Sequence, residues 1–425
     1  MRVPPSLRTR PTPAAQASAL LLRVGLGLLL ILAPMTSVGS RRAFLVLAPL
    51  GISIVFLAAL LEGRGRRTVR SALRFLASPA GIAAIFFLVW AALSLIWTSS
   101  QQLGFDRLVK IAATLLLAVF ACVSLPPRMR ASNLYLIPIG VALAGTLIIA
   151  AAVYGLLPFR AFDADQPTLD RAAAAISLQL FAGLGWLMTR QRPFATAALV
   201  ALVVLGTVLC DAEDSVLAIG CGLLVAVAVA FRPRLVPRVL AAVVALVALL
   251  APLAVLALHA RRADLSFFDG DSLRALDIWA RVTVQDPLRM LTGHGMESAA
   301  FDRLAGNIGL DGPRSMLFEV WYELGLLGAL ALASFLGMGV LAAGRLALPV
   351  AASALGAITC AFILGCLGAG TVQTWWMTTL CLAAVAFAGV QNGQYRSERP
   401  RATLFGGGNL RPFASGPAPG RDLPA

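Results

Sequence analysis

Charge is scarce in this chain. Only 13% of its 425 residues are charged, whereas 59% are hydrophobic and the mean hydropathy is +0.85. Soluble proteins carry charge on about a quarter of their residues, so this composition excludes a soluble fold. The scarcity of charge therefore predicts a protein built to sit in lipid.

Side chains that commonly bind metals are also few. The chain has two histidines, and its six cysteines form no Cys-x-x-Cys pair and have no accompanying histidine. Because the cysteines fall within or at the ends of apolar runs, we expect them to be small packing residues. Structural zinc and a disulfide framework are not expected, and we predict neither a metal nor a cofactor.

Long apolar runs are what the chain has in abundance. A helix needs about 20 mostly apolar residues to cross the hydrocarbon core, and each span must satisfy its own backbone hydrogen bonds. We therefore expect an all-α polytopic membrane protein with about twelve transmembrane helices. The runs lie near residues 17–38, 43–62, 80–98, 109–126, 133–157, 172–189, 194–210, 214–231, 238–259, 318–343, 348–369 and 373–391.

The basic residues between these runs indicate an orientation, because cytoplasmic loops are enriched in arginine and lysine. Arginines precede the first run and follow most even-numbered runs, as at 64–74, whereas alternate loops such as 163–170 carry acid. Both ends of the chain should then be cytoplasmic, and the large loop at 260–316, between spans nine and ten, should face outward. Arg41 and Arg42 are on the wrong side in this scheme.

The formal net charge of +15 raises the question of a nucleic-acid partner. The basic residues, however, are spread over short loops beside apolar runs, where they serve as topology signals with some contact to anionic lipid head groups. We expect the lipid bilayer as a partner and no nucleic acid.

The two ends of the chain differ from its interior. Residues 1–16 and 392–425 contain prolines or glycines and lack a periodic apolar pattern, which predicts disordered cytoplasmic tails. Residues 17–391 are expected to form one transmembrane domain that includes the loop at 260–316.

The outward loop contains the pattern of an amphipathic helix. Asp271 and Ser272 are placed to cap a helix that runs to about Gln285, and its apolar residues fall on a different face from Arg274 and Arg281. We expect this helix to lie at the membrane surface.

Two glutamates lie at the start of the tenth span, on one side of its helix. Ser315, Glu319 and Glu323 recur at i, i+4 and i+8, so they form one polar stripe. An ion pair with Arg314 or with a loop arginine would fix the loop on the helices. Alternatively, the carboxylates hold a reacting hydroxyl or orient arginines that bind an anionic substrate, because ionisable groups at membrane depth are costly. The spacing leaves both readings open.

The entry to the tenth span also carries an ordered motif, Pro313-Arg314-Ser315-(x)3-Glu319-Val320-Trp321-Tyr322-Glu323-Leu324-Gly325-(x)2-Gly328. It resembles the signature of the O-antigen ligase and polymerase superfamily, whose usual form is P-H-N-(x)3-Q-(x)-W-(x)-E-L-G-(x)2-G. Three further pieces agree in order: Arg274-Ala275-Leu276-Asp277-Ile278-Trp279 followed by Asp286-Pro287 and Gly293-His294-Gly295, then Leu169-Asp170-Arg171-Ala172, and Asp214-Ser215-Val216-Leu217-Ala218. The resemblance spans about residues 20–390.

The resemblance implies a metal-independent glycosyltransferase at the periplasmic face of the bacterial inner membrane. It would take a glycan from undecaprenyl pyrophosphate and join it to a hydroxyl, on lipid A core for a ligase or on another glycan for a polymerase. Arginine suits the leaving group, because its planar fork grips phosphate oxygens bidentately. We expect this role for Arg171, Arg274 and Arg281.

One residue departs from the family signature. Where the family has a histidine, often proposed as the base that activates the acceptor hydroxyl, this chain has Arg314, which has no acceptor lone pair and is unsuited to that role. Glu319 or Glu323 could be the base, with Arg314 joining the pyrophosphate clamp, or His294 could act if the loop folds back. The third reading is a ligase-like assembly factor without this chemistry.

Two tryptophans lie in the motifs, and a transporter is the rival function. Trp279 and Trp321 should be packing or interfacial anchors first and sugar contacts second. A flippase or transporter would place ionisable groups near the membrane midplane. Because the expected spans are nearly free of charge, apart from Arg23 and the entrance residues, chemistry at the outer face is favoured.

Overall fold

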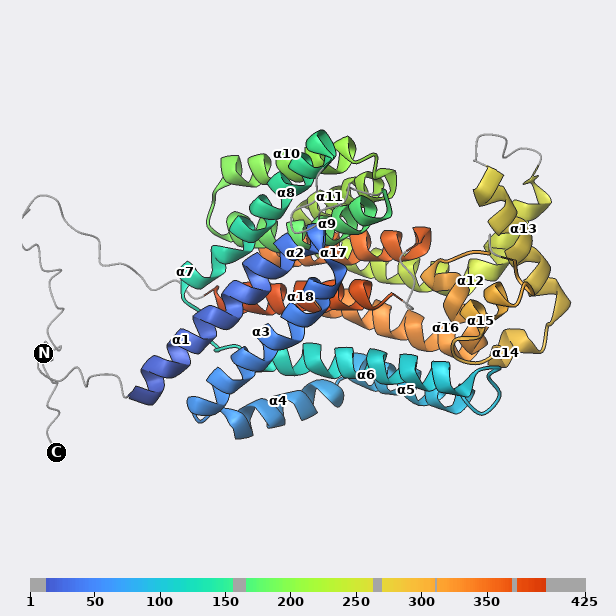
Figure 1. Ribbon diagram of the computed structural model, residues 1–425, viewed down its shortest axis with the longest axis horizontal. Coiled ribbons are helices and arrows are strands. Elements are labelled where there is room, and N and C mark those ends of the chain that lie inside the picture. The colour runs from blue at the N-terminus through green and yellow to red at the C-terminus, as the bar shows by residue number, and fades with distance from the viewer. Residues whose placement is uncertain (1–12, 156–165, 263–269, 310–311, 369–372, 395–425) are drawn as a thin grey trace, which may run out of the picture. The chain divides into compact units, whose positions relative to one another are not determined.

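The computed structural model describes residues 13–155, 166–262, 270–309, 312–368 and 373–394. Every regular element within these ranges is a helix, which confirms the expected all-α fold (Figure 1). The tails expected at the two ends lie almost entirely outside the described residues.

The helices follow the apolar runs of the sequence. The first half contains α1 (Pro13–Gly27), the π-helical turn η2 (Leu28–Leu32), α2 (Ala33–Gly39), α3 (Arg41–Leu61), α4 (Gly65–Leu76), α5 (Pro79–Ser94), α6 (Gln101–Ser124), α7 (Ala131–Leu134), α8 (Leu136–Tyr154) and α9 (Gln166–Thr189). The second half contains α10 (Pro193–Leu209), α11 (Glu213–Phe231), α12 (Val236–Ala260), α13 (Gly270–Gln285), α14 (Arg289–Thr292), α15 (Ser298–Leu304), α16 (Met316–Ala343), α17 (Leu348–Leu367) and α18 (Thr374–Asn392).

Ten helical segments in the described part of the chain are long and apolar enough to cross a membrane. Two of the twelve expected spans form helices shorter than the about 20 residues that a full span needs: α5 has 16 residues and α10 has 17. The axes of α4 and α5 are bent by 76° to each other, and counting that pair as one span gives up to eleven. The chain is therefore a multi-pass membrane protein, and the count of twelve spans stays a prediction.

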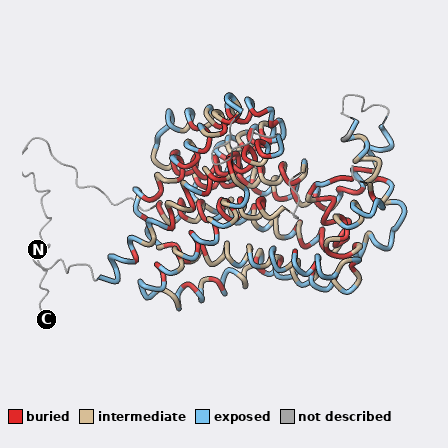
Figure 2. The backbone as a smooth tube through the Cα atoms, viewed as in Figure 1, coloured by how far each residue is buried: buried red, intermediate tan, exposed pale blue. Residues whose placement is uncertain are grey.

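Helix α9 lies at the centre of the packing. Nearly all of its residues are buried, and it packs against α8, α10, α17 and α18, where Figure 2 shows the buried backbone concentrated. Small residues allow the next layer to approach closely: a Cβ on Gly222 of α11 would lie only 2.7 Å from the carbonyl oxygen of Gly356 of α17. Such close backbone packing is what holds helices together in lipid.

Helix α16 is interrupted at Gly325. Its φ of 61° and ψ of −157° belong to a region that is open essentially only to glycine. Three carbonyls just before the break accept hydrogen bonds from other segments: those of Tyr322 and Glu323 from the backbone N–H groups of His294 (2.8 Å) and Gly295 (2.9 Å), and that of Leu324 from the indole of Trp90 (2.8 Å). The break thus fastens the 293–295 loop and α5 to α16.

Replacing Gly325 with alanine should destabilise the protein by roughly 2–3 kcal/mol, because a side chain is strained at this φ and ψ. The added Cβ would also lie 2.6 Å from the backbone nitrogen of Gly293. Thermal unfolding of the purified protein in detergent measures the loss. Gly339→Ala in the same helix is the matched control, since a Cβ there meets open space. Equal unfolding temperatures for the two variants would contradict the assigned role of the break.

Candidate functional site

The short helices between α12 and α16 pack against the first turns of α16. Trp279 of α13 contacts Phe318 edge to face, with the ring centroids 5.4 Å apart. Asp302 of α15 accepts a hydrogen bond of 2.8 Å from the Tyr322 hydroxyl. The first two turns of α16 are therefore the surface against which α13 and α15 pack.

Arg107 of α6 contacts three carboxylates beside these turns of α16. Its guanidinium lies 2.8 and 2.9 Å from the two carboxylate oxygens of Glu323, 2.9 Å from Glu297 and 3.4 Å from Glu319. Arg303 of α15 approaches Glu319 to 3.9 Å. We call these two arginines and three glutamates the Arg107 cluster. It joins α6, α15 and α16 through charge.

Three members of the cluster are shielded from solvent. Arg107 is 6% exposed, and Glu319 and Glu323 are each 2% exposed. Buried charges persist only when they are paired and hydrogen-bonded, since desolvation of an isolated ion is very costly. Burial lowers the pKa of the Arg303 guanidinium and the Glu319 carboxylate opposes that shift, but an arginine remains protonated. The five groups therefore pair with one another inside the protein.

Sequence reasoning missed Arg107 and Glu297. The apolar pattern starts the fourth span near 109, whereas α6 begins at Gln101, two turns earlier. Arg107 thus joins the charged residues at the entrances of the spans, because it lies in the second turn of α6. The signal in the sequence is Arg107 with Lys110 at helical spacing, directly before an apolar run.

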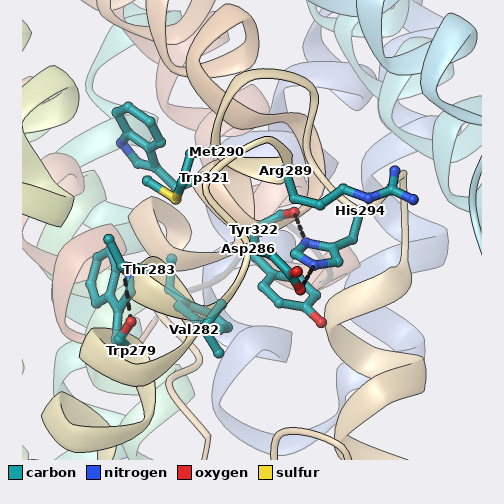
Figure 3. Close-up of a pocket in the computed structure, with 10 residues that line it drawn as sticks. Trp279, Val282, Thr283, Asp286, Arg289, Met290, His294, Trp321 and Tyr322 are labelled. Atoms are coloured by element: carbon teal, nitrogen blue, oxygen red, sulfur yellow. Dashed lines mark hydrogen bonds and ion pairs between the residues drawn. The ribbon is translucent and has the colours of Figure 1, made fainter.

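A pocket lies between the 279–294 segment and α16. It is partly open to solvent, and its cavity volume is about 10 Å³, roughly the space of one water molecule. Aromatic and polar side chains line it, among them Trp279, Asp286, Arg289, His294, Phe318, Trp321 and Tyr322 (Figure 3). Apolar walls with a few convergent polar groups are typical of ligand sites, and aromatic faces suit stacking on a ring.

His294 is held in one orientation at this pocket. Its ring stacks on Tyr322, with 4.1 Å between centroids and 9° between the planes, and its Nδ1 lies 3.1 Å from the Tyr322 carbonyl oxygen (Figure 3). Because a carbonyl only accepts, this bond puts a proton on Nδ1. In the neutral ring Nε2 is then the basic nitrogen, and it lies 3.7 Å from the Asp286 carboxylate.

The structure brings several predicted residues together. Glu319 and Glu323 both reach Arg107, which confirms that they share one side of the helix. The loop arginine that pairs with Glu319 is Arg303, not Arg314. Trp279 and His294 line the pocket.

Trp321 combines packing with a place at the pocket. It is buried, and its indole donates a 2.8 Å hydrogen bond to the Ala248 carbonyl of α12. That bond confirms the expected packing role, because it ties α16 to α12. A contact with sugar stays a prediction for both Trp321 and Trp279.

The four arginines expected to bind pyrophosphate lie elsewhere. Arg274, Arg281 and Arg314 are exposed, and Arg171 donates a 2.6 Å hydrogen bond to Thr168 at the start of α9. None of the four is among the residues that line the pocket described above. Their role with a pyrophosphate stays a prediction, while Arg289, which the sequence patterns did not single out, is the arginine at the pocket.

Neither a protein-family model nor a curated protein matches this chain. Among the residues that the structure describes, no group of three or more His, Cys, Asp or Glu side chains is arranged to hold a metal ion.

Replacing Arg107 with glutamine should destabilise the protein by about 3–5 kcal/mol, because it leaves buried carboxylates without their cation. Combining it with Glu323→Gln should recover part of this loss, since Glu323 has both carboxylate oxygens on Arg107. Chemical unfolding in mixed micelles measures both. The exposed Arg281→Gln should change stability by less than about 0.5 kcal/mol. A double variant no more stable than Arg107→Gln would show that the two groups are not coupled.

Proposed function

We propose that this chain transfers a glycan from undecaprenyl pyrophosphate to an acceptor hydroxyl at the periplasmic face of the bacterial inner membrane. The ordered motifs that resemble the O-antigen ligase and polymerase superfamily support this proposal. The observation that carries it is an oriented imidazole, His294, beside a carboxylate, an arginine and aromatic walls in one pocket. The same chemistry serves a ligase acting on lipid A core and a polymerase acting on a second glycan.

His294 is the residue best suited to be the base that the signature position lacks. Its Nδ1 proton is engaged by the Tyr322 carbonyl, which leaves Nε2 to accept a proton. Asp286 lies close enough to Nε2 to stabilise the imidazolium that forms. Arg314, in contrast, has no lone pair to offer.

The reaction then proceeds by one displacement. The acceptor hydroxyl gives its proton to Nε2 of His294 as its oxygen attacks the anomeric carbon of the donor. The bond between that carbon and the phosphate oxygen breaks, and the pyrophosphate keeps the electron pair. Arg289 at the pocket supplies positive charge for the leaving group.

Glu319 and Glu323 are positioning residues in this proposal. Both carboxylates are buried against guanidinium groups, so an acceptor hydroxyl has little access to them. They hold α6 and α15 against α16, the helix whose broken end fixes the His294 loop. This reading replaces the sequence-based hypothesis that one of the two serves as the relocated base.

The depth of the charged residues favours this chemistry over transport. Arg107 lies in the second turn of α6, and Glu319 and Glu323 lie in the first three turns of α16. At a rise of about 1.5 Å per residue these groups are within roughly 12 Å of the helix starts. Transporters place such charged groups near the midplane, and the break at Gly325 of α16 is the feature that this chain shares with them.

The test begins with deletion of the gene that encodes this chain. Undecaprenyl-pyrophosphate-linked glycan should accumulate on the periplasmic side of the membrane, as measured by mass spectrometry of lipid extracts with a sidedness probe. Accumulation on the cytoplasmic side would instead identify a flippase.

Purified protein in liposomes, supplied with this extracted donor and membrane lipids as acceptor, tests the residues. His294→Gln should lower the rate of undecaprenyl pyrophosphate release by about 10²–10⁴-fold, the usual contribution of a general base. His259→Gln, at the other histidine and outside the pocket, is the matched control. Release that appears only in Arg314→His would indicate an inactive, ligase-like assembly factor.

A further inference from the structure

Helix α4 presents two unlike surfaces to its surroundings. Arg66, Arg70 and Arg74 recur at i, i+4 and i+8 and share one side with Arg67. All four are exposed, and none of them forms an ion pair with another described residue. We call these four residues the arginine face.

The rest of α4 is mostly apolar, with Thr68 and Ser71 as its polar residues, and only part of it contacts protein. Thr68 and Ala72 are buried, whereas Val69 is 48% and Leu73 is 60% exposed. At 100° per residue, Val69 and Leu73 lie between the buried side and the arginine face. Exposed apolar residues next to a row of arginines form the pattern of a helix that lies in a membrane interface.

The attachment of α4 fixes its level relative to the spans. Arg64, just before the helix, donates a 3.0 Å hydrogen bond to the Ser124 carbonyl at the last residue of α6. Helix α3 ends at Leu61, four residues before α4 begins. Helix α4 therefore starts where two candidate spans end, which is the boundary between hydrocarbon and head groups.

The charge and the bend decide between crossing the membrane and lying on it. Four arginines within twelve residues are far too costly to place in the hydrocarbon core. The 76° angle between α4 and α5 turns α4 away from the direction of the span that follows. Phosphate oxygens of lipid head groups accept hydrogen bonds from the planar fork of a guanidinium group, and they occur at this level of the bilayer.

We propose that the arginine face of α4 binds the phosphate head groups of anionic phospholipids, with Val69 and Leu73 inserted among the acyl chains. The α6 end of the same boundary adds exposed Arg128 and Arg130. The acid nearest to α4 in the sequence, Glu62, is paired with Arg64. This surface is separate from the pocket, and its role does not depend on glycan transfer.

The experiment uses the full chain purified in neutral detergent and native mass spectrometry with short-chain phosphatidylglycerol or phosphatidylcholine. The wild type should bind phosphatidylglycerol more tightly. Arg66→Gln with Arg70→Gln and Arg74→Gln should weaken that binding by about five-fold for each arginine removed and leave phosphatidylcholine binding unchanged. Leu73→Asn should weaken binding of both lipids.

Two controls keep the outcome decisive. Arg232→Gln with Arg234→Gln and Arg238→Gln removes three exposed arginines from a different loop, and lysine at 66, 70 and 74 preserves the charge. The lysine variant should keep most of the preference, and the loop variant should keep all of it. Equal losses in the two glutamine variants, or competition by millimolar inorganic phosphate alone, would overturn a lipid site on α4.

Discussion

The site depends on a single buried guanidinium. Arg107 is buried in the bundle with three glutamates around it, and its guanidinium is the counter-charge of the buried carboxylates. The partners come from α6, from the residue that precedes α15, and from α16. The need to pair this buried charge thus constrains tertiary structure. It fixes the positions of α15 and α16 relative to α6, a span more than 180 residues earlier in the chain.

The break in α16 positions the His294 loop beside this helix. Because Gly325 leaves the helical conformation, carbonyls near the end of the first half of α16 accept hydrogen bonds from the 293–295 loop and from α5. Tyr322 holds His294 twice, through its carbonyl oxygen and through its ring. The first three turns of α16 therefore supply both the glutamates of the Arg107 cluster and the tyrosine that orients His294.

The two ends of α6 have opposite electrostatic character. Near its start Arg107 pairs with the glutamates, whereas its last residue accepts a hydrogen bond from Arg64 and is followed by the exposed Arg128 and Arg130. Between them, α9 and its neighbours pack small and apolar residues with almost no charge. Such a division suits a protein with anionic lipid at one surface and chemistry at the other.

Composition and apolar periodicity alone determined that this is an all-α membrane protein, since in lipid a run of apolar residues has only one way to satisfy its backbone. The i, i+4 spacing determined that Glu319 and Glu323 share a side. Their partner did not follow from the sequence. Arg107 is over 200 residues away from them, at the edge of an apolar run that hid it, and nothing local marks a long-range ion pair. The place of His294 at the pocket and the enclosure of Glu319 and Glu323 with Arg107 were likewise decided by tertiary structure, because only the folded chain determines which carboxylates are enclosed with a cation and which ring nitrogen stays open.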